Sequence, residues 1–244
     1  MFTLFFKEIK IFFISPIVYV VLSAYWSLNS IIFIIVENDY NLFHNKFIDF
    51  NLFFSITPWF LIILIPAIVM RLFSEELNSG RIELILTKPL SVSNIIWSKY
   101  FASLFLILVS VIPTIIYIIY ASQFAKDNTE IEKELILSSY LGLFLLCSNL
   151  ISICIPVSIA FRNQITIFIF SSFLCFCQFY LFDQIGNFTN SNYFFEIILN
   201  IGSKYHYENF INGIITIRDI GYFFGFNLIL MSVSLYIFNK HLNE

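Results

Sequence analysis

The sequence predicts an all-α integral membrane protein with six transmembrane helices, and three observations support this fold class. The chain of 244 residues is 59% hydrophobic and 12% charged, whereas soluble domains contain about 25% charged residues. Long stretches free of Asp, Glu, Lys, Arg and His reach the ~17–25 residues that a helix needs to cross a bilayer. A charged insert separates the second stretch from the third. The six predicted spans are about 14–36, 52–70, 101–120, 138–160, 165–182 and 220–238.

The apolar surplus extends over the whole length, so residues 1–244 are predicted to form a single membrane domain. The net charge is −3 and no basic stripe occurs, which argues against a nucleic-acid partner. The first stretch is too long for the apolar core of a signal peptide, so we expect it to remain as the first span. Cysteines lie inside apolar stretches and histidines are scattered, so no metal site and no cofactor are predicted.

Residues 1–13 are predicted to form a separate helix that lies on the membrane surface. Lys7 and Lys10 point away from an aromatic face, and Ser15-Pro16 breaks the helix before the first span. The alternative is a plain N-terminal extension of that span. The aromatic face has the spacing of one side of a helix and consists of Phe2, Phe5, Phe6, Ile9, Phe12 and Phe13.

The distribution of Lys and Arg predicts that both termini are cytoplasmic, because cytoplasmic loops carry an excess of these residues. In this orientation the inside holds Lys7, Lys10, Arg71, Arg81, Lys88, Lys99, Arg162 and Lys240, and the outside holds Lys46, Lys126, Lys133, Lys204 and Arg218. The last external segment, 183–219, contains two short apolar runs at 193–201 and 210–217. We expect both runs to be short helices that dip into the outer leaflet; a surface loop is the alternative.

The insert after the second span is predicted to be a compact, capped helical unit in the cytoplasm. Ser74 is a good N-cap, and Glu75 and Glu76 would occupy the first turn, where the helix dipole favours acids. Gly80 permits a bend or a C-cap, and Pro89 ends a second short segment that contains Glu83. An ordinary loop with solvated charges is the alternative from spacing alone.

The residues of this insert resemble the signature of the type-two ABC exporter permease family. Within that family the sequence is most similar to the permeases of gliding-motility transporters. Further similar stretches are 15–19, 58–67 and 212–222. The matching positions in the insert are Arg71, Phe73, Ser74, Glu75, Glu76, Gly80, Glu83, Leu84, Thr87, Pro89, Ser91 and Lys99.

The resemblance implies a permease of the inner membrane, in which the insert is a coupling helix that docks on a separate ABC ATPase subunit. It also implies a second permease copy or a related membrane subunit within the lipid bilayer. The implied partner-binding residues are Arg71, Phe73, Ser74, Glu75, Glu76, Gly80, Glu83 and Pro89.

Three other functions are weighed against this one. No phosphate-binding loop of the G-x-x-x-x-G-K-[ST] type occurs, so the ATPase would be a separate subunit and this chain is not predicted to be an enzyme. No ionisable residue lies in the six apolar stretches, which argues against a gradient-driven secondary transporter. A non-transporting scaffold of a motility or envelope complex stays open, since anchoring and coupling can use the same insert.

Overall fold

The computed structural model describes residues 2–35, 50–80, 91–117, 119, 133–188 and 199–243. Within these residues, six helices are long and apolar enough to cross a membrane. This confirms the predicted all-α class and the predicted number of spans. The helices are α1 (Phe2–Ile14), α2 (Pro16–Ser30), α3 (Phe50–Asn78), α5 (Val92–Val111), α7 (Lys133–Ala160), α8 (Gln164–Phe176), α9 (Phe182–Phe188), α11 (Ser203–Ile211) and α12 (Ile217–Asn243).

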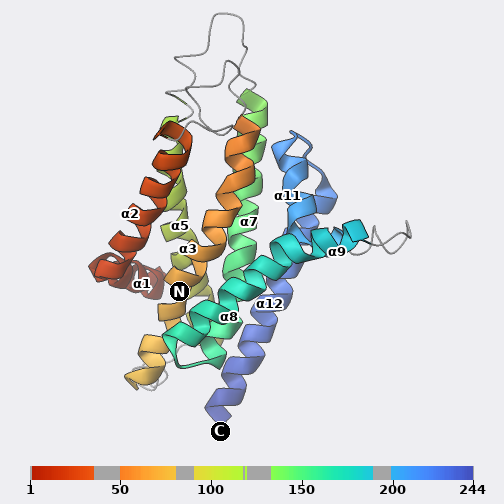
Figure 1. Cartoon of the computed structure of the whole chain (residues 1–244). Helices are drawn as coiled ribbons and strands as arrows, with labels where there is room; N and C mark the ends of the chain where they lie inside the picture. Colours follow the sequence, from red (N-terminus) through yellow and green to blue (C-terminus); the bar gives the residue numbers. More distant parts are fainter. Residues whose placement is uncertain are drawn as a thin grey trace, which may run out of the picture.

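Helix α7 is the centre of the bundle. Its most extensive contacts are with α3 and α12, and it also packs against α5, α8 and α11. Of an 18-residue apolar window in α7, 89% is buried, compared with 28% in the span that begins with α8 and 22% in α12. Figure 1 shows α7 inside the bundle, with α2, α8 and α12 around it. The outer helices therefore present most of their apolar surface to the outside of the chain.

Helix α1 is separate from the first span, as the sequence predicts. Ser15 has an extended backbone, with φ −76° and ψ 120°, and Pro16 is the first residue of α2. Proline is well tolerated there because the first N–H of a helix has no partner within the helix. In Figure 1, α1 lies across the direction of α2. A continuous N-terminal extension of the first span is therefore wrong.

Two spans are longer than their charge-free stretches. Helix α3 continues without a break to Asn78 rather than ending near residue 70, and α5 begins at Val92, ahead of the charge-free stretch that starts at residue 101. The predicted N-cap at Ser74 is wrong, because the Ser74 hydroxyl donates to the Met70 carbonyl inside α3, 2.6 Å away. Charged residues end an apolar stretch but are good helix formers, so the helix passes through them. The Ser91 side chain caps α5 by accepting a hydrogen bond from the Asn94 N–H.

A proline inside α3 determines where α11 docks. Pro58 has no N–H, so the carbonyl of Phe54, one turn earlier, has no partner within the helix. The Tyr207 hydroxyl of α11 donates to this carbonyl at 2.8 Å. Tyr207 is 1% exposed. The short helix is thus attached to the bundle through a backbone group that the proline leaves open.

The helix in the last external segment differs from the prediction. The run 193–198 lies outside the described residues. The predicted helix at 210–217 is wrong, since α11 ends at Ile211 and a turn follows, with Gly213 at φ +78°. The buried face of α11 is partly polar. A prediction from runs of apolar residues therefore places this helix at the wrong residues. This face follows the spacing of a helix and consists of Ser203, His206, Tyr207, Phe210 and Ile211.

Polar side chains join the spanning helices at a few points. Asn227 of α12 donates to the Ser148 hydroxyl of α7 at 3.0 Å and accepts from the Ser152 hydroxyl at 2.9 Å. The Gln178 amide nitrogen donates to the Ile201 carbonyl and to the Tyr222 hydroxyl. Such bonds hold membrane helices together where lipid provides no hydrophobic drive.

Candidate coupling site

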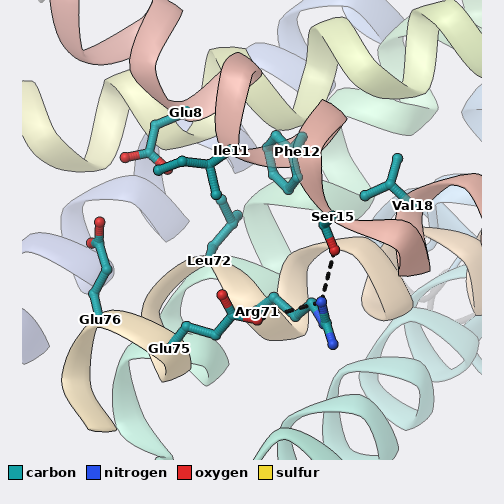
Figure 2. A pocket seen from close by; sticks show the side chains of 9 residues that line it. All are labelled: Glu8, Ile11, Phe12, Ser15, Val18, Arg71, Leu72, Glu75 and Glu76. Carbon is teal, nitrogen blue, oxygen red and sulfur yellow. Dashed lines mark hydrogen bonds and ion pairs between the residues drawn. The ribbon is translucent and has the colours of Figure 1, made fainter. Parts of the chain in front are cut away.

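The candidate site lies where the C-terminal end of α3 meets α1 and the beginning of α5. The charged residues that end the apolar run of α3 fall on its last turns, beside the break between α1 and α2. Figure 2 shows Glu8, Phe12 and Ser15 on one side and Arg71 and Glu76 of α3 on the other. Segments far apart in the sequence therefore meet at this end of the bundle.

Lys99 is the centre of the site. Its ammonium lies 3.2 Å from Glu8 Oε2 of α1, 2.8 Å from Glu76 Oε2 of α3 and 2.6 Å from the Leu72 carbonyl. It also lies 5.0 Å from the centre of the Phe73 ring. The side chain is 1% exposed. The ammonium donates hydrogen bonds to Glu8 and to the Leu72 carbonyl, and it forms an ion pair with Glu76.

A second lysine balances the charge of this cluster. Lys7 Nζ lies 3.3 Å from Glu76 Oε1 and 4.0 Å from Glu8 Oε1. Two carboxylates thus face two ammonium groups. Burial of unpaired charge is costly, and this pairing is what permits Glu8, Glu76 and Lys99 to be buried. We call Lys7, Glu8, Glu76 and Lys99 the ionic cluster. It joins α1, α3 and α5.

Arg71 makes a second link between α3 and the N-terminal segment. Its Nη1 donates to the Ser15 hydroxyl at 2.8 Å and lies 3.4 Å from Glu75 Oε1, one turn further along α3. Ser15 is the residue at the break between α1 and α2. The position of this break is therefore tied to the last turns of α3.

The cavity between these residues is small. Its volume is about 40 Å³, enough for very few water molecules, each of which needs about 10–15 Å³ by this measure. A substrate does not fit, so the site is a junction between helices and not a binding pocket. The lining residues are Glu8, Ile11, Phe12, Ser15, Val18, Arg71, Leu72, Glu75 and Glu76.

The structure divides the predicted partner-binding residues into two groups. Phe73, Ser74 and Glu76 are buried within the chain. The Glu75 side chain is 37% exposed, and Gly80 is exposed in the turn after α3 with φ +66°, which agrees with a C-cap. Glu83 and Pro89 lie outside the described residues. Among the described residues of this set, Glu75 and Gly80 are the accessible ones, and Arg71 is partly buried with 22% of its side chain exposed.

Sequence reasoning missed Glu8 and Lys99 as a pair. The sequence offers two signals for this pair. One is a lone acid among the phenylalanines of residues 2–13, and the other is a lone lysine just before the third apolar stretch. Glu8 lies in the middle of the apolar helix α1 and Lys99 lies just before an apolar stretch, and a charge buried at either position needs a partner. The partner is 91 residues away in the sequence, so spacing does not identify it.

The six candidate spans of the described residues define the chain as a multi-pass membrane protein. The model of the ABC-2 family transporter proteins matches residues 5–241. The chain therefore belongs to the ABC-2 transporter family and is a membrane component of an ABC transporter rather than its catalytic part. No curated protein matches the chain.

Proposed function

We propose that this chain is the permease subunit of an ATP-driven exporter in the inner membrane, with both termini in the cytoplasm. A separate ABC ATPase subunit would dock on the exposed end of α3 and on the residues that follow. The observation that carries the proposal is the ionic cluster, because it connects the end of α3 to α1 and α5. Residues 1–244 would act as one membrane domain.

The geometry supports transmission of force from the docking surface into the membrane. Helix α3 is continuous from Phe50 to Asn78, so a displacement of its cytoplasmic end moves the part that packs on α7. Lys99 carries the displacement to α5, and Glu8 and Lys7 carry it to α1. Closely packed helices shift as units rather than deform. ATP-driven movement of the partner would thus reach three helices through one junction.

The contact surface is narrower than the sequence signature. Of the two signature acids that the structure describes, Glu75 has an exposed side chain, while Glu76 is paired with Lys7 and Lys99. A change at Glu76 would disturb the fold before it disturbed a partner. Glu75 is therefore the residue with which to test docking.

Charge reversal by Glu75→Lys is expected to reduce co-purification with the ATPase at least about fivefold, which corresponds to about 1 kcal/mol at an interface. The matched control is Glu208→Lys on α11, at the opposite end of the bundle, where Glu208 is 50% exposed and pairs with Lys204 at i,i+4. The control should bind normally. Equal co-purification of both variants would refute docking at the end of α3.

The orientation has its own test. With both termini inside, a reagent that cannot cross the membrane should not label Ser79→Cys in intact cells, and should label it in inverted vesicles. Ser79 is exposed in the turn after α3. Labelling from outside would reverse the proposed topology.

A second permease copy, or a related membrane subunit, completes the proposal. Large apolar side chains cover the outward faces of α3 and α8, where Ile63, Ile169 and Phe173 are 58%, 58% and 60% exposed.

The finer assignment to gliding motility is supported by the sequence resemblance of 15–19 and 212–222. Normal gliding by cells that lack this chain would refute it.

A further inference from the structure

A groove lies between α8 and α12, and no residue of the ionic cluster lines it. Both helices pack on α7, and Figure 1 shows α8 inclined to the direction of α7 and α12. The groove between them has a volume of about 350 Å³. Its floor is formed by Ile153, Pro156 and Val157 of α7. This volume is more than twice the ~150 Å³ of an apolar cavity that binds benzene.

The chemistry of the walls suits hydrocarbon. The walls include Leu174 of α8 and Phe226 and Leu230 of α12. Gln178 is a polar lining residue, and its amide nitrogen is already engaged by the Ile201 carbonyl at 2.8 Å and the Tyr222 hydroxyl at 2.6 Å. A ligand in the groove therefore meets aliphatic and aromatic carbon along its length.

The groove is located in the part of the chain that the bilayer surrounds. All three helices that line it are candidate spans. The floor residues belong to the last turns of α7, so the groove lies in the leaflet next to the connection between α7 and α8. Lipid is the solvent at this position, and the molecule at highest concentration there is an acyl chain.

Two positive residues lie at the end of the groove where a lipid headgroup would be. Arg162 follows Phe161, a lining residue, in the turn between α7 and α8, and it is exposed. Lys240 is exposed and comes three residues after Ile237, another lining residue, on the same side of α12. Positive side chains at this level attract anionic headgroups.

We propose that the groove binds one acyl chain of an anionic phospholipid, with Arg162 and Lys240 contacting its phosphate. The lipid fills the space between α8 and α12. Both helices then contact the acyl chain as well as α7. This binding site does not depend on the ATPase, so it stands or falls separately from the proposed function.

The experiment uses the full chain in nanodiscs of phosphatidylcholine that contain a small fraction of phosphatidylglycerol with a photoreactive acyl chain. Crosslinks located by mass spectrometry should concentrate on Val157, Leu174 and Leu230. Leu230→Trp, which fills the groove, should lower labelling of Val157 at least about fivefold. The control is Ile229→Trp, the adjacent residue of the same helix, which is 64% exposed and does not line the groove. It should leave labelling unchanged.

A second arm tests the headgroup. Arg162→Gln should reduce the preference for phosphatidylglycerol over phosphatidylcholine about fivefold, the effect expected for one basic residue near an anionic surface. Arg162→Lys should retain the preference. This variant lies in an exposed turn, so it tests the site even if Leu230→Trp fails to fold.

Two results would overturn the proposal. Crosslinks spread evenly over the exposed faces of α8 and α12 would show ordinary boundary lipid. A disulfide between Val157→Cys of one chain and Leu230→Cys of another, together with loss of lipid labelling, would show that a second copy covers the groove.

Discussion

Lys99 shows how a charged residue can be buried at the end of a spanning helix. One carboxylate and one carbonyl accept hydrogen bonds from it, a second carboxylate forms an ion pair with it, and Lys7 neutralises the remaining negative charge. Breaking a buried pair by removing one partner typically costs about 3–5 kcal/mol, because the other charge is left without compensation. The cluster thus stabilises the contact of α1 with α3 and α5 only as a complete set.

Lys99→Met should lower the stability of the purified protein by about 3–5 kcal/mol, since Glu8 and Glu76 would then face each other with Lys7 alone. Thermal unfolding in detergent measures the loss. Lys10→Met, on the exposed side of α1, is the control and should have little effect. The triple change Lys99→Met, Glu8→Gln and Glu76→Gln should regain part of the stability. An unaltered melting temperature for Lys99→Met would show that the cluster contributes nothing.

Tyr207→Phe should destabilise the protein by about 0.6–1.7 kcal/mol, the range for hydrogen bonds between membrane helices. The change leaves the Phe54 carbonyl without a donor. In a Pro58→Ala background the residue at 58 supplies the missing N–H, so the same change should cost less. The four proteins are the parent chain, the two single variants and the double variant. Their free energies of unfolding in mixed micelles give the cost of Tyr207→Phe in each background. Equal costs in both backgrounds would mean that the proline does not create the docking point.

At the scale of elements, α11 is an example of a short helix that the bundle holds in place. Ser138 of α7 donates to the Phe210 carbonyl at 2.9 Å. At the other side, His206 is stacked on Tyr222 at 4.0 Å and hydrogen-bonded to Asp219 of α12. Asp219 also accepts from Asn209 and Thr216. Helix α11 is therefore positioned by contacts with α3, α7 and α12 rather than by its own composition.

Helix α11 packs tightly against α7 at Gly142. A Cβ atom there would lie 2.4 Å from Phe210 Cβ. Gly142→Ala should therefore push α11 away from α7 and cost about 1–3 kcal/mol, as overpacking does. Gly225→Ala on α12, where a Cβ meets nothing within 4 Å, should leave stability unchanged or slightly higher. Hydrogen exchange of the α11 amides would report the displacement, and the same protection in both variants would contradict it.

At the scale of the whole molecule, the described residues form six apolar helices with a few ionisable groups near their ends. The sequence argument that no charge lies in the membrane core needs correction, because α3, α5 and α12 extend past the apolar stretches and bury Glu76, Lys99 and Asp219. Each of these is paired within the described part of the chain, with Glu8, Lys7 or His206. They form local clusters and not a connected relay for protons.

The purified chain alone should therefore neither hydrolyse ATP nor move solute down an imposed proton or sodium gradient. Reconstitution in liposomes with and without the ATPase measures both. The permease function would be supported by ATP-dependent transport that requires the ATPase and that Glu75→Lys weakens. Flux driven by a gradient in the lone chain would favour a secondary transporter, and binding of the ATPase without any transport would favour a scaffold.

The sequence by itself determined the class, the number of spans and the break at Ser15-Pro16. These depend on composition, on the length of apolar runs and on the backbone of proline, which are all local properties. The tertiary structure alone decided the pairing of Glu8 with Lys99, the docking of Tyr207 on Phe54 and the burial of Glu76 beside the exposed Glu75. These depend on which helices lie side by side. Charged residues that favour a helix, and buried helix faces that are partly polar, have no distinctive sequence pattern. Their roles become visible only when the fold shows which distant residues they contact.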